Sequence, residues 1–178
     1  MNKEETDKYY IGETFKLALN GKYTVHPNPM VGAVIVKNGK IMGQGYHLKP
    51  GSPHAEQEAI NDAGKSAHNS TLYINLEPCC HYGRTPPCSD LIIRSKIKRV
   101  VVSSLDPNPV VNGKSIEQLK RSGIEVKIGV LKDDAIKLNQ GFFNKFLLKR
   151  PSVTCKSGIS LDGKISLSNG SSKWITSE

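Results

Sequence analysis

The sequence lacks the features that would place the chain in a membrane or in a secretory pathway. No stretch approaches the roughly 18 consecutive apolar residues that are needed to span a bilayer. The first ten residues contain acids, and no apolar run followed by a small-residue cleavage site is present, so they are not a secretory signal. We therefore expect a cytoplasmic protein without a membrane partner.

Aromatic residues are also scarce, at 6% of the 178 residues. Proteins that bind single-stranded nucleic acid combine aromatic stacking platforms with a basic groove, and neither pattern stands out here. The net charge of +9 favours an anionic partner, which could be a phosphorylated metabolite or a nucleic acid. The lysines are scattered, however, and a compositional bias toward surface lysine would give the same charge, so the charge alone decides nothing.

Cysteines are few, and their positions are informative. Three of the four, Cys79, Cys80 and Cys88, lie within ten positions, whereas Cys155 stands alone. In a chain expected to be intracellular, this spacing indicates metal binding or catalysis more than a disulfide framework.

The hydrophobic pattern predicts helices and strands in alternation. The Asn38-Gly39 pair predicts a hairpin between the first two strands, and Ser52-Pro53 predicts the N-cap and first position of the second helix. Continuous apolar strands separated by helices are typical of a parallel sheet covered on both faces. We expect an α/β fold, a three-layer α/β/α sandwich with a mostly parallel five-stranded sheet. The expected helices are 7–20, 52–63, 89–97, 115–121 and 133–148, and the expected strands are 31–36, 40–46, 71–76, 99–105 and 124–130.

The C-terminal segment differs in composition from the rest. Pro151 breaks the preceding helix, residues 152–159 have the pattern of a strand, and the remainder is rich in glycine and serine. Thirty residues are too few to bury a core of their own. We therefore expect one domain over residues 1–148 and a separate segment over residues 149–178.

Two short motifs indicate a catalytic metal site. His54-Ala55-Glu56 opens the second predicted helix, Pro78-Cys79 follows a strand, and Cys88 comes nine positions later. One imidazole and two thiolates supply three ligands of a tetrahedral Zn²⁺ ion and leave the fourth position open for water. Zinc lowers the pKa of bound water toward about 7. Glu56 is not needed as a ligand and could shuttle protons, a combination that is typical of zinc deaminases.

A closed structural zinc site is the alternative. It would use His54, Cys79 and Cys88 with Cys80 or His81 as the fourth ligand, and it would leave Glu56 without a role. We interpret Cys80 as a small buried or neighbouring residue and not as a ligand.

The eight-residue spacing between Cys79 and Cys88 resembles the diaminohydroxyphosphoribosylaminopyrimidine deaminases of riboflavin synthesis. Three blocks carry this resemblance across residues 1–148: HPNPMVG at 26–32, CCHYGRTPPC at 79–88 and DPNP at 106–109. Cys80 departs from the serine that is common in that family, which should not affect the metal. The resemblance implies a cytidine-deaminase-like fold, one Zn²⁺ per chain and a homo-oligomer.

The implied reaction is the hydrolytic deamination of 2,5-diamino-6-(5-phosphoribosylamino)pyrimidin-4(3H)-one to 5-amino-6-(5-phosphoribosylamino)uracil and ammonia. The resemblance makes His54, Cys79 and Cys88 the zinc ligands and Glu56 the catalytic proton shuttle. It also implies substrate binding by Asn28, His47, Asp106 and Asn108. Turn formation beside proline is the simpler explanation for Asn28 and Asn108, and both roles can coexist. Arg84 is a candidate for the phosphate, or a solvated surface residue.

The C-terminal segment resembles the opening of the reductase domain of the bifunctional riboflavin enzyme. The similarity lies in Lys156, in residues 160–163 and in residues 174–176. It implies that Gly158 and Trp174 contact NADP and that Ser172 contacts substrate, but only where a complete reductase domain is present. We expect no reductase activity from residues 1–178, and a separate reductase chain is a possible partner.

Two other functions fit parts of the pattern. A zinc-dependent nucleic-acid or nucleoside deaminase would suit the positive charge, but those enzymes usually have two residues between the cysteines. A non-catalytic zinc module is the third hypothesis, and Glu56 argues against it. Substitution of Glu56 by glutamine separates catalysis from simple metal binding.

Overall fold

The computed structural model describes residues 2–83 and 86–172 of the chain. Helices and strands alternate, as the hydrophobic pattern predicts. Their order is α1 (Lys3–Leu19), β1 (Gly32–Lys37), β2 (Lys40–Tyr46), α2 (Ala55–Ala63), a 3₁₀ turn (Gly64–Ala67), β3 (Thr71–Leu76), α3 (Cys88–Arg94), β4 (Arg99–Ser104), α4 (Lys114–Arg121), β5 (Glu125–Ile128), α5 (Lys132–Leu138) and α6 (Gln140–Leu147). No helix within these described ranges is long and apolar enough to cross a membrane.

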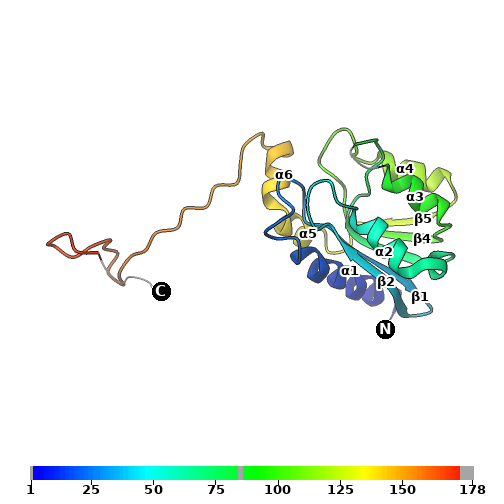
Figure 1. Cartoon of the computed structure of the whole chain (residues 1–178), viewed down its shortest axis with the longest axis horizontal. Helices are drawn as coiled ribbons and strands as arrows, with labels where there is room; N and C mark the ends of the chain where they lie inside the picture. The colour runs from blue at the N-terminus through cyan, green and yellow to red at the C-terminus, as the bar shows by residue number, and fades with distance from the viewer. Residues whose placement is uncertain (1, 84–85, 173–178) are drawn as a thin grey trace.

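The sheet is covered on both faces, which confirms the three-layer α/β/α sandwich (Figure 1). Successive residues of a strand point to opposite faces, so each strand contributes to two cores. Residues such as Ile35, Ile74 and Val102 pack against α2, α3 and α4. The alternate residues, among them Val34 and Val101, pack against α1 and the start of α5.

The prediction of a mostly parallel sheet was partly wrong, because the five-stranded sheet is mixed. The strand order is β2-β1-β3-β4-β5. Strand β1 runs antiparallel to both β2 and β3, whereas the β3–β4 and β4–β5 pairs are parallel. Helix α2 connects β2 to β3 in the sequence, and β1 lies between these two strands in the sheet. Because β1 is buried on both faces, its continuous apolar pattern is the same for either direction of pairing.

The position of α2 depends on two glycines of β2. A Cβ atom at Gly43 would lie 2.4 Å from the carbonyl oxygen of Ala59, and one at Gly45 would lie 2.6 Å from that of Ala55. These contacts are too short for any side chain, so glycine lets the helix backbone lie directly on the strand. The start of α2 is thereby fixed relative to the sheet, and the start of α2 carries the first of the motif residues.

The N-cap prediction for α2 was also wrong. The helix begins at Ala55, and His54 is its N-cap residue in an extended conformation. Ser52 belongs instead to the preceding turn, where its hydroxyl donates to the carbonyl of Lys49 at 2.7 Å. The His54 side chain therefore projects from the end of the helix and not from its side.

The single helix expected over 133–148 is two helices, because it breaks at Asn139. The side chain of Asn139 is 5% exposed and bonds the backbone of Met30. The amide of Met30 donates to Asn139 Oδ1 at 2.8 Å, and Asn139 Nδ2 donates to the carbonyl of Met30 at 2.9 Å. Two hydrogen bonds to a distant loop thus replace helical continuity at this residue.

Residues 152–159 form no strand, contrary to the prediction. The described residues from 151 onward have no helix or strand, and nearly all of them are exposed. In Figure 1 this segment runs away from α6 and from the sheet. A strand needs a partner for its N–H and C=O groups, and none of the described strands lies beside it.

Candidate metal centre and active site

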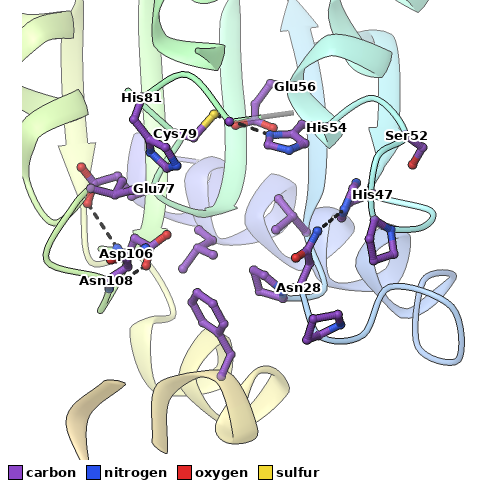
Figure 2. Close-up of a pocket in the computed structure, with 18 of the residues that line it drawn as sticks. Asn28, His47, Ser52, His54, Glu56, Glu77, Cys79, His81, Asp106 and Asn108 are labelled. Atoms are coloured by element: carbon purple, nitrogen blue, oxygen red, sulfur yellow. Dashed lines mark hydrogen bonds between the residues drawn. The ribbon is translucent and has the colours of Figure 1, made fainter. Parts of the chain in front are cut away.

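Three predicted ligands come together at the ends of three elements. His54 caps α2, Cys79 follows β3, and Cys88 opens α3. His54 Nδ1 lies 3.6 Å from Cys79 Sγ and 3.4 Å from Cys88 Sγ. All three donor atoms lie within 4.8 Å of one another, and Figure 2 shows His54 and Cys79 side by side, with Glu56 next to them.

These distances fit a tetrahedral zinc ion. Zinc binds thiolate sulfur at about 2.3 Å and imidazole nitrogen at about 2.0–2.1 Å, so a tetrahedral angle puts the two ligand atoms about 3.6 Å apart. Hydrogen bonding to Cys88, opposed by burial and helped by His54, lowers the pKa of Cys79 and favours its thiolate form. Within the part of the chain that the structure describes, neither Cys80 nor His81 joins this group.

Glu56 lies beside this cluster in the first turn of α2 and is only 2% exposed. Its Oε2 atom has no hydrogen-bond partner among the described residues. Burial, together with the negative charge of a Cys79 thiolate, raises the pKa of Glu56 to about 7. A carboxyl group with such a pKa can both accept and release a proton near neutral pH.

The cluster opens into a cavity of about 490 Å³. Four of the six residues predicted to bind substrate line it, together with His54, Glu56 and Cys79 (Figure 2). These four residues are Asn28, His47, Asp106 and Asn108. The structure thus brings five chain segments that are far apart in the sequence to one cavity.

Asn28 and His47 form a defined pair in the cavity wall. Asn28 Nδ2 lies 3.0 Å from His47 Nε2, and His47 Nδ1 lies 3.1 Å from the carbonyl of Pro53. Because the Pro53 carbonyl can only accept, Nδ1 carries the proton and Nε2 accepts from Asn28. Burial lowers the pKa of His47, which stabilises this neutral form. The bond to His47 leaves Asn28 Oδ1 available as an acceptor.

Asp106 and Asn108 belong to the loop that follows β4. The amide of Asn108 donates to Asp106 Oδ1 at 2.8 Å, and the amide of Val110 donates to Asn108 Oδ1 at 3.1 Å. Asn108 therefore has the turn role that the sequence offered as the simpler explanation, and it also lines the cavity. Burial raises the pKa of Asp106 to about 6, with Glu77 adding to the effect.

Comparison with known proteins decides the family. Residues 4–104 match the family described as the cytidine and deoxycytidylate deaminase zinc-binding region. The chain is 52% identical over 139 residues to the diaminohydroxyphosphoribosylamino-pyrimidine deaminase of Buchnera aphidicola subsp. Schizaphis graminum, covering 78% of this chain and 95% of that protein. The chain belongs to the riboflavin-biosynthesis deaminases of this zinc-binding family.

Longer relatives are equally similar. The riboflavin biosynthesis protein RibD of Aquifex aeolicus is 55% identical over 174 residues, which cover 98% of this chain and 49% of that protein. The crystal structure of the Thermotoga maritima diaminohydroxyphosphoribosylaminopyrimidine deaminase/5-amino-6-(5-phosphoribosylamino)uracil reductase is 45% identical, with a TM-score of 0.93, and is matched over 99% of this chain and 51% of that one. The chain thus spans about half the length of these two relatives.

Sequence reasoning missed Glu77, which supports one wall of the deaminase cavity. Glu77 is 4% exposed and accepts hydrogen bonds from two amides of the segment between β4 and α4 and from a hydroxyl at the start of α4. The amides of Asp106 and Gly113 donate to Oε2 at 3.2 and 2.9 Å, and the Ser115 hydroxyl donates to Oε1 at 2.8 Å. The available signal was an acid directly after an apolar strand and two residues before Cys79, a predicted metal ligand.

Two buried asparagines, also missed, hold the opposite wall. The amide of Gly32 donates to Asn75 Oδ1 at 2.8 Å, and Asn75 Nδ2 donates to the carbonyl of Met30 at 2.9 Å. Asn139 bonds the same Met30 peptide from the other side. The segment that carries Asn28 is therefore fixed from β3 and from the junction of α5 and α6.

The remaining predicted residues do not reach the cavity or are not described. Arg84 and Trp174 lie outside the described residues. Gly158 and Ser172 lie in the exposed C-terminal segment, where the Ser172 hydroxyl donates to the carbonyl of Ile165 at 3.0 Å. Neither residue lines the cavity.

Proposed function

We propose that the chain removes the exocyclic amine at C2 of 2,5-diamino-6-(5-phosphoribosylamino)pyrimidin-4(3H)-one. Water replaces the amine, and the products are 5-amino-6-(5-phosphoribosylamino)uracil and ammonia. The observation that carries this proposal is one cavity that unites a His-Cys-Cys cluster, the buried Glu56 and four polar side chains. The identity to the Buchnera deaminase, which extends over 95% of that protein, supports the same substrate.

In this mechanism His54, Cys79 and Cys88 hold the zinc ion, and Glu56 transfers the protons. When bound, zinc supplies the Lewis acidity that makes water nucleophilic at neutral pH. Glu56 accepts a proton from the attacking water and delivers it to the adjacent ring nitrogen. It then transfers the second proton to the departing amine, so that ammonia leaves and the carboxylate is restored. The side chain of Glu56 is buried and its Oε2 atom has no partner among the described residues, so the carboxyl group can serve in both steps.

The polar wall residues orient the pyrimidine in this proposal. Asn28 offers Oδ1 as an acceptor for a ring or amine N–H, because His47 occupies its Nδ2. Asp106 and Asn108 bind the opposite edge, and Glu77 keeps their loop in place. A fixed pattern of donors and acceptors selects one heterocycle over another, because a wrong ring leaves buried polar groups unpaired.

The phosphate needs a cation that the described lining does not supply. Among the described residues that line the cavity, none is a lysine or an arginine. Arg84 follows the lining residues His81 and Gly83 in the sequence. We assign the phosphate to Arg84, because a guanidinium binds phosphate oxygens in a bidentate manner.

The domain boundaries, assembly and location belong to the same proposal. In this proposal residues 1–148 form the deaminase, and residues 149–178 form the opening of a reductase region. The similarity to the longer relatives over 98% and 99% of this chain supports the second assignment. Roles for Gly158 and Trp174 toward NADP and for Ser172 toward substrate depend on such a region. A homo-oligomer, a separate reductase partner and a cytoplasmic location stay predictions.

The decisive experiment measures zinc content and ammonia release on the purified chain. We expect about one zinc per chain. With the freshly made diaminopyrimidine substrate we expect ammonia in an amount equal to the substrate consumed. Deoxycytidylate and single-stranded DNA serve as competing substrates. Zinc without ammonia from any of them would overturn the catalytic proposal, and ammonia from DNA alone would favour the nucleic-acid deaminase.

A further inference from the structure

The cavity has an aromatic wall that the proposed mechanism does not use. Phe142 of α6 lines it together with Asn28, Asn108 and two cluster residues, His54 and Cys79. In Figure 2 the labelled residues His54, Cys79 and Glu56 lie at the top, whereas the yellow ribbon of α5 and α6 lies at the bottom. Asn28, Asp106 and Asn108 lie between these two ends. Helix α6 therefore forms the end of the cavity that is opposite the reacting group.

The placement of Phe142 is fixed from both sides. Three residues earlier, Asn139 makes its two hydrogen bonds to Met30, which fix the start of α6 against the loop that carries Asn28. The ring of Phe142 also makes edge contacts with Phe146 and Phe143, at centroid distances of 5.1 and 6.2 Å. Phe142 is only half-buried by these neighbours, so part of its ring remains free to face the cavity.

The position of Phe142 in the chain indicates its role. The region shared with cytidine and deoxycytidylate deaminases ends at residue 104 and contains His54, Glu56, Cys79 and Cys88. Phe142 lies outside that region, together with Asp106 and Asn108 of the same cavity. The shared region thus supplies the metal and the proton shuttle, and the later segments supply walls that a cytosine deaminase need not share.

We propose that Phe142 is a specificity-determining residue that packs against the part of the substrate farthest from the reacting carbon. This inference rests on the proposed function. If C2 is held at the metal end, the 5-amino group lies directly across the ring, with the 6-ribosylamino group next to it. These two substituents distinguish the substrate from cytosine, and they point toward α6. An apolar aromatic face there excludes water and favours a planar, substituted ring.

The test compares Phe142→Ala and Phe142→Leu with Phe143→Ala as the matched control. Phe143 is the neighbouring aromatic residue, but it is 4% exposed and does not line the cavity. We expect Phe142→Ala to raise KM for the diaminopyrimidine substrate roughly tenfold, with kcat within about threefold and zinc retained. Phe142→Leu keeps most of the apolar volume and should give a smaller increase. Phe143→Ala should lower Tm and change KM much less than Phe142→Ala does, because Phe143 does not line the cavity and Phe142 keeps its closer ring contact with Phe146.

A second readout separates specificity from general damage. Calorimetry measures the affinity for the uracil product. This affinity should fall in Phe142→Ala in proportion to the rise in KM, and it should fall much less in Phe143→Ala. A folded, zinc-loaded Phe142→Ala protein with unchanged KM and product affinity would overturn the inference while leaving the deaminase intact. Absence of ammonia from the unmutated chain would instead overturn the proposed function, so the two failures are distinguishable.

Discussion

Two buried carboxyl groups lie at opposite ends of the parallel strands and have opposite pKa shifts. Asp7 of α1, 0% exposed, lies against Arg99 at the start of β4, and Glu56, 2% exposed, lies beside Cys79 after the end of β3. Both lose water by burial, which raises the pKa of a carboxyl group. For Asp7, hydrogen bonds from Arg99 and Lys127 outweigh burial and lower the pKa to about 2.

The opposite pKa shifts of Asp7 and Glu56 arise from their hydrogen-bond and charge partners and not from a difference in burial. Arg99 contacts both oxygens of Asp7, at 2.7 and 2.9 Å, and Lys127 adds a third contact at 2.8 Å. Glu56 keeps one oxygen without a partner among the described residues, and its pKa is raised to about 7. A carboxylate that is fully paired holds the structure together, whereas one that is left unpaired can exchange a proton.

The largest expected effect is the loss of catalysis in Glu56→Gln. Glutamine keeps the shape of the side chain but cannot accept and return a proton, so kcat for ammonia release should fall by about 10³-fold. Zinc content should stay at about one per chain, and Tm should change little, because glutamine keeps the volume of the side chain and one oxygen that can accept a hydrogen bond. Retained activity would mean that another group transfers the protons. Asp7→Asn is the matched control, since it alters the other buried acid.

Asp7→Asn should have the reverse profile. The substitution removes the bidentate carboxylate partner of the buried Arg99 and leaves it only the more exposed Glu125, at 2.9 Å. Loss of such a buried partner typically costs about 3 kcal/mol of folding free energy. Urea denaturation measures this loss. At a temperature where the variant is still folded, kcat and KM should match those of the unmutated chain, because the ion cluster and the cavity share no residue. A catalytic defect in folded Asp7→Asn would contradict the conclusion that the ion cluster around Asp7 stabilises the fold without taking part in catalysis.

The pH dependence of stability sharpens the comparison. The pKa of Asp7 is lower in the folded state, about 2, than its ordinary value near 3.8. Its contribution is therefore fully present above about pH 4 and is lost as the pH falls toward 2, in total about 2.5 kcal/mol. Other carboxylates titrate in the same range, so the measurement is the difference in unfolding free energy between the unmutated chain and Asp7→Asn. That difference in unfolding free energy should become smaller as the pH falls from 4 toward 2. A constant difference would contradict a lowered pKa for Asp7 in the folded state.

The metal end of the molecule was largely predictable from sequence, because its information is local. His54 and Glu56 are two positions apart at a helix start, and Cys79 follows a strand, so their residue types and spacing predict the chemistry. The wall residues Asn28, His47, Asp106 and Asn108 needed the family resemblance, because no spacing rule connects them. The structure gathers them at one cavity, while their roles in binding remain proposals.

The contacts that position these residues could not be predicted. Asp7 and Arg99 are 92 positions apart, and Asn139 and Met30 are 109 apart, so no local pattern links them. The helical periodicity of 133–148 hid the break at Asn139, because a tertiary contact overrides the local preference. The direction of β1 was equally hidden, since a strand buried on both faces has the same apolar pattern in either orientation.

Glu77 is a third buried acid, and it differs from Asp7 and Glu56 in its partners. Its oxygens accept hydrogen bonds from the segment after β4 that carries Asp106 and Asn108, so its substitution should affect substrate binding selectively. Glu77→Ala removes the acceptor for the amides of Asp106 and Gly113, so the loop that carries Asn108 should lose its fixed position. We expect KM to rise about tenfold with a smaller change in kcat, since Glu56 is unaffected. Glu77→Gln keeps one carbonyl oxygen for both amides and should restore most of the affinity. A fall in kcat with unchanged KM in Glu77→Ala would mean that this acid acts on Cys79, the proposed metal ligand, and not on substrate binding.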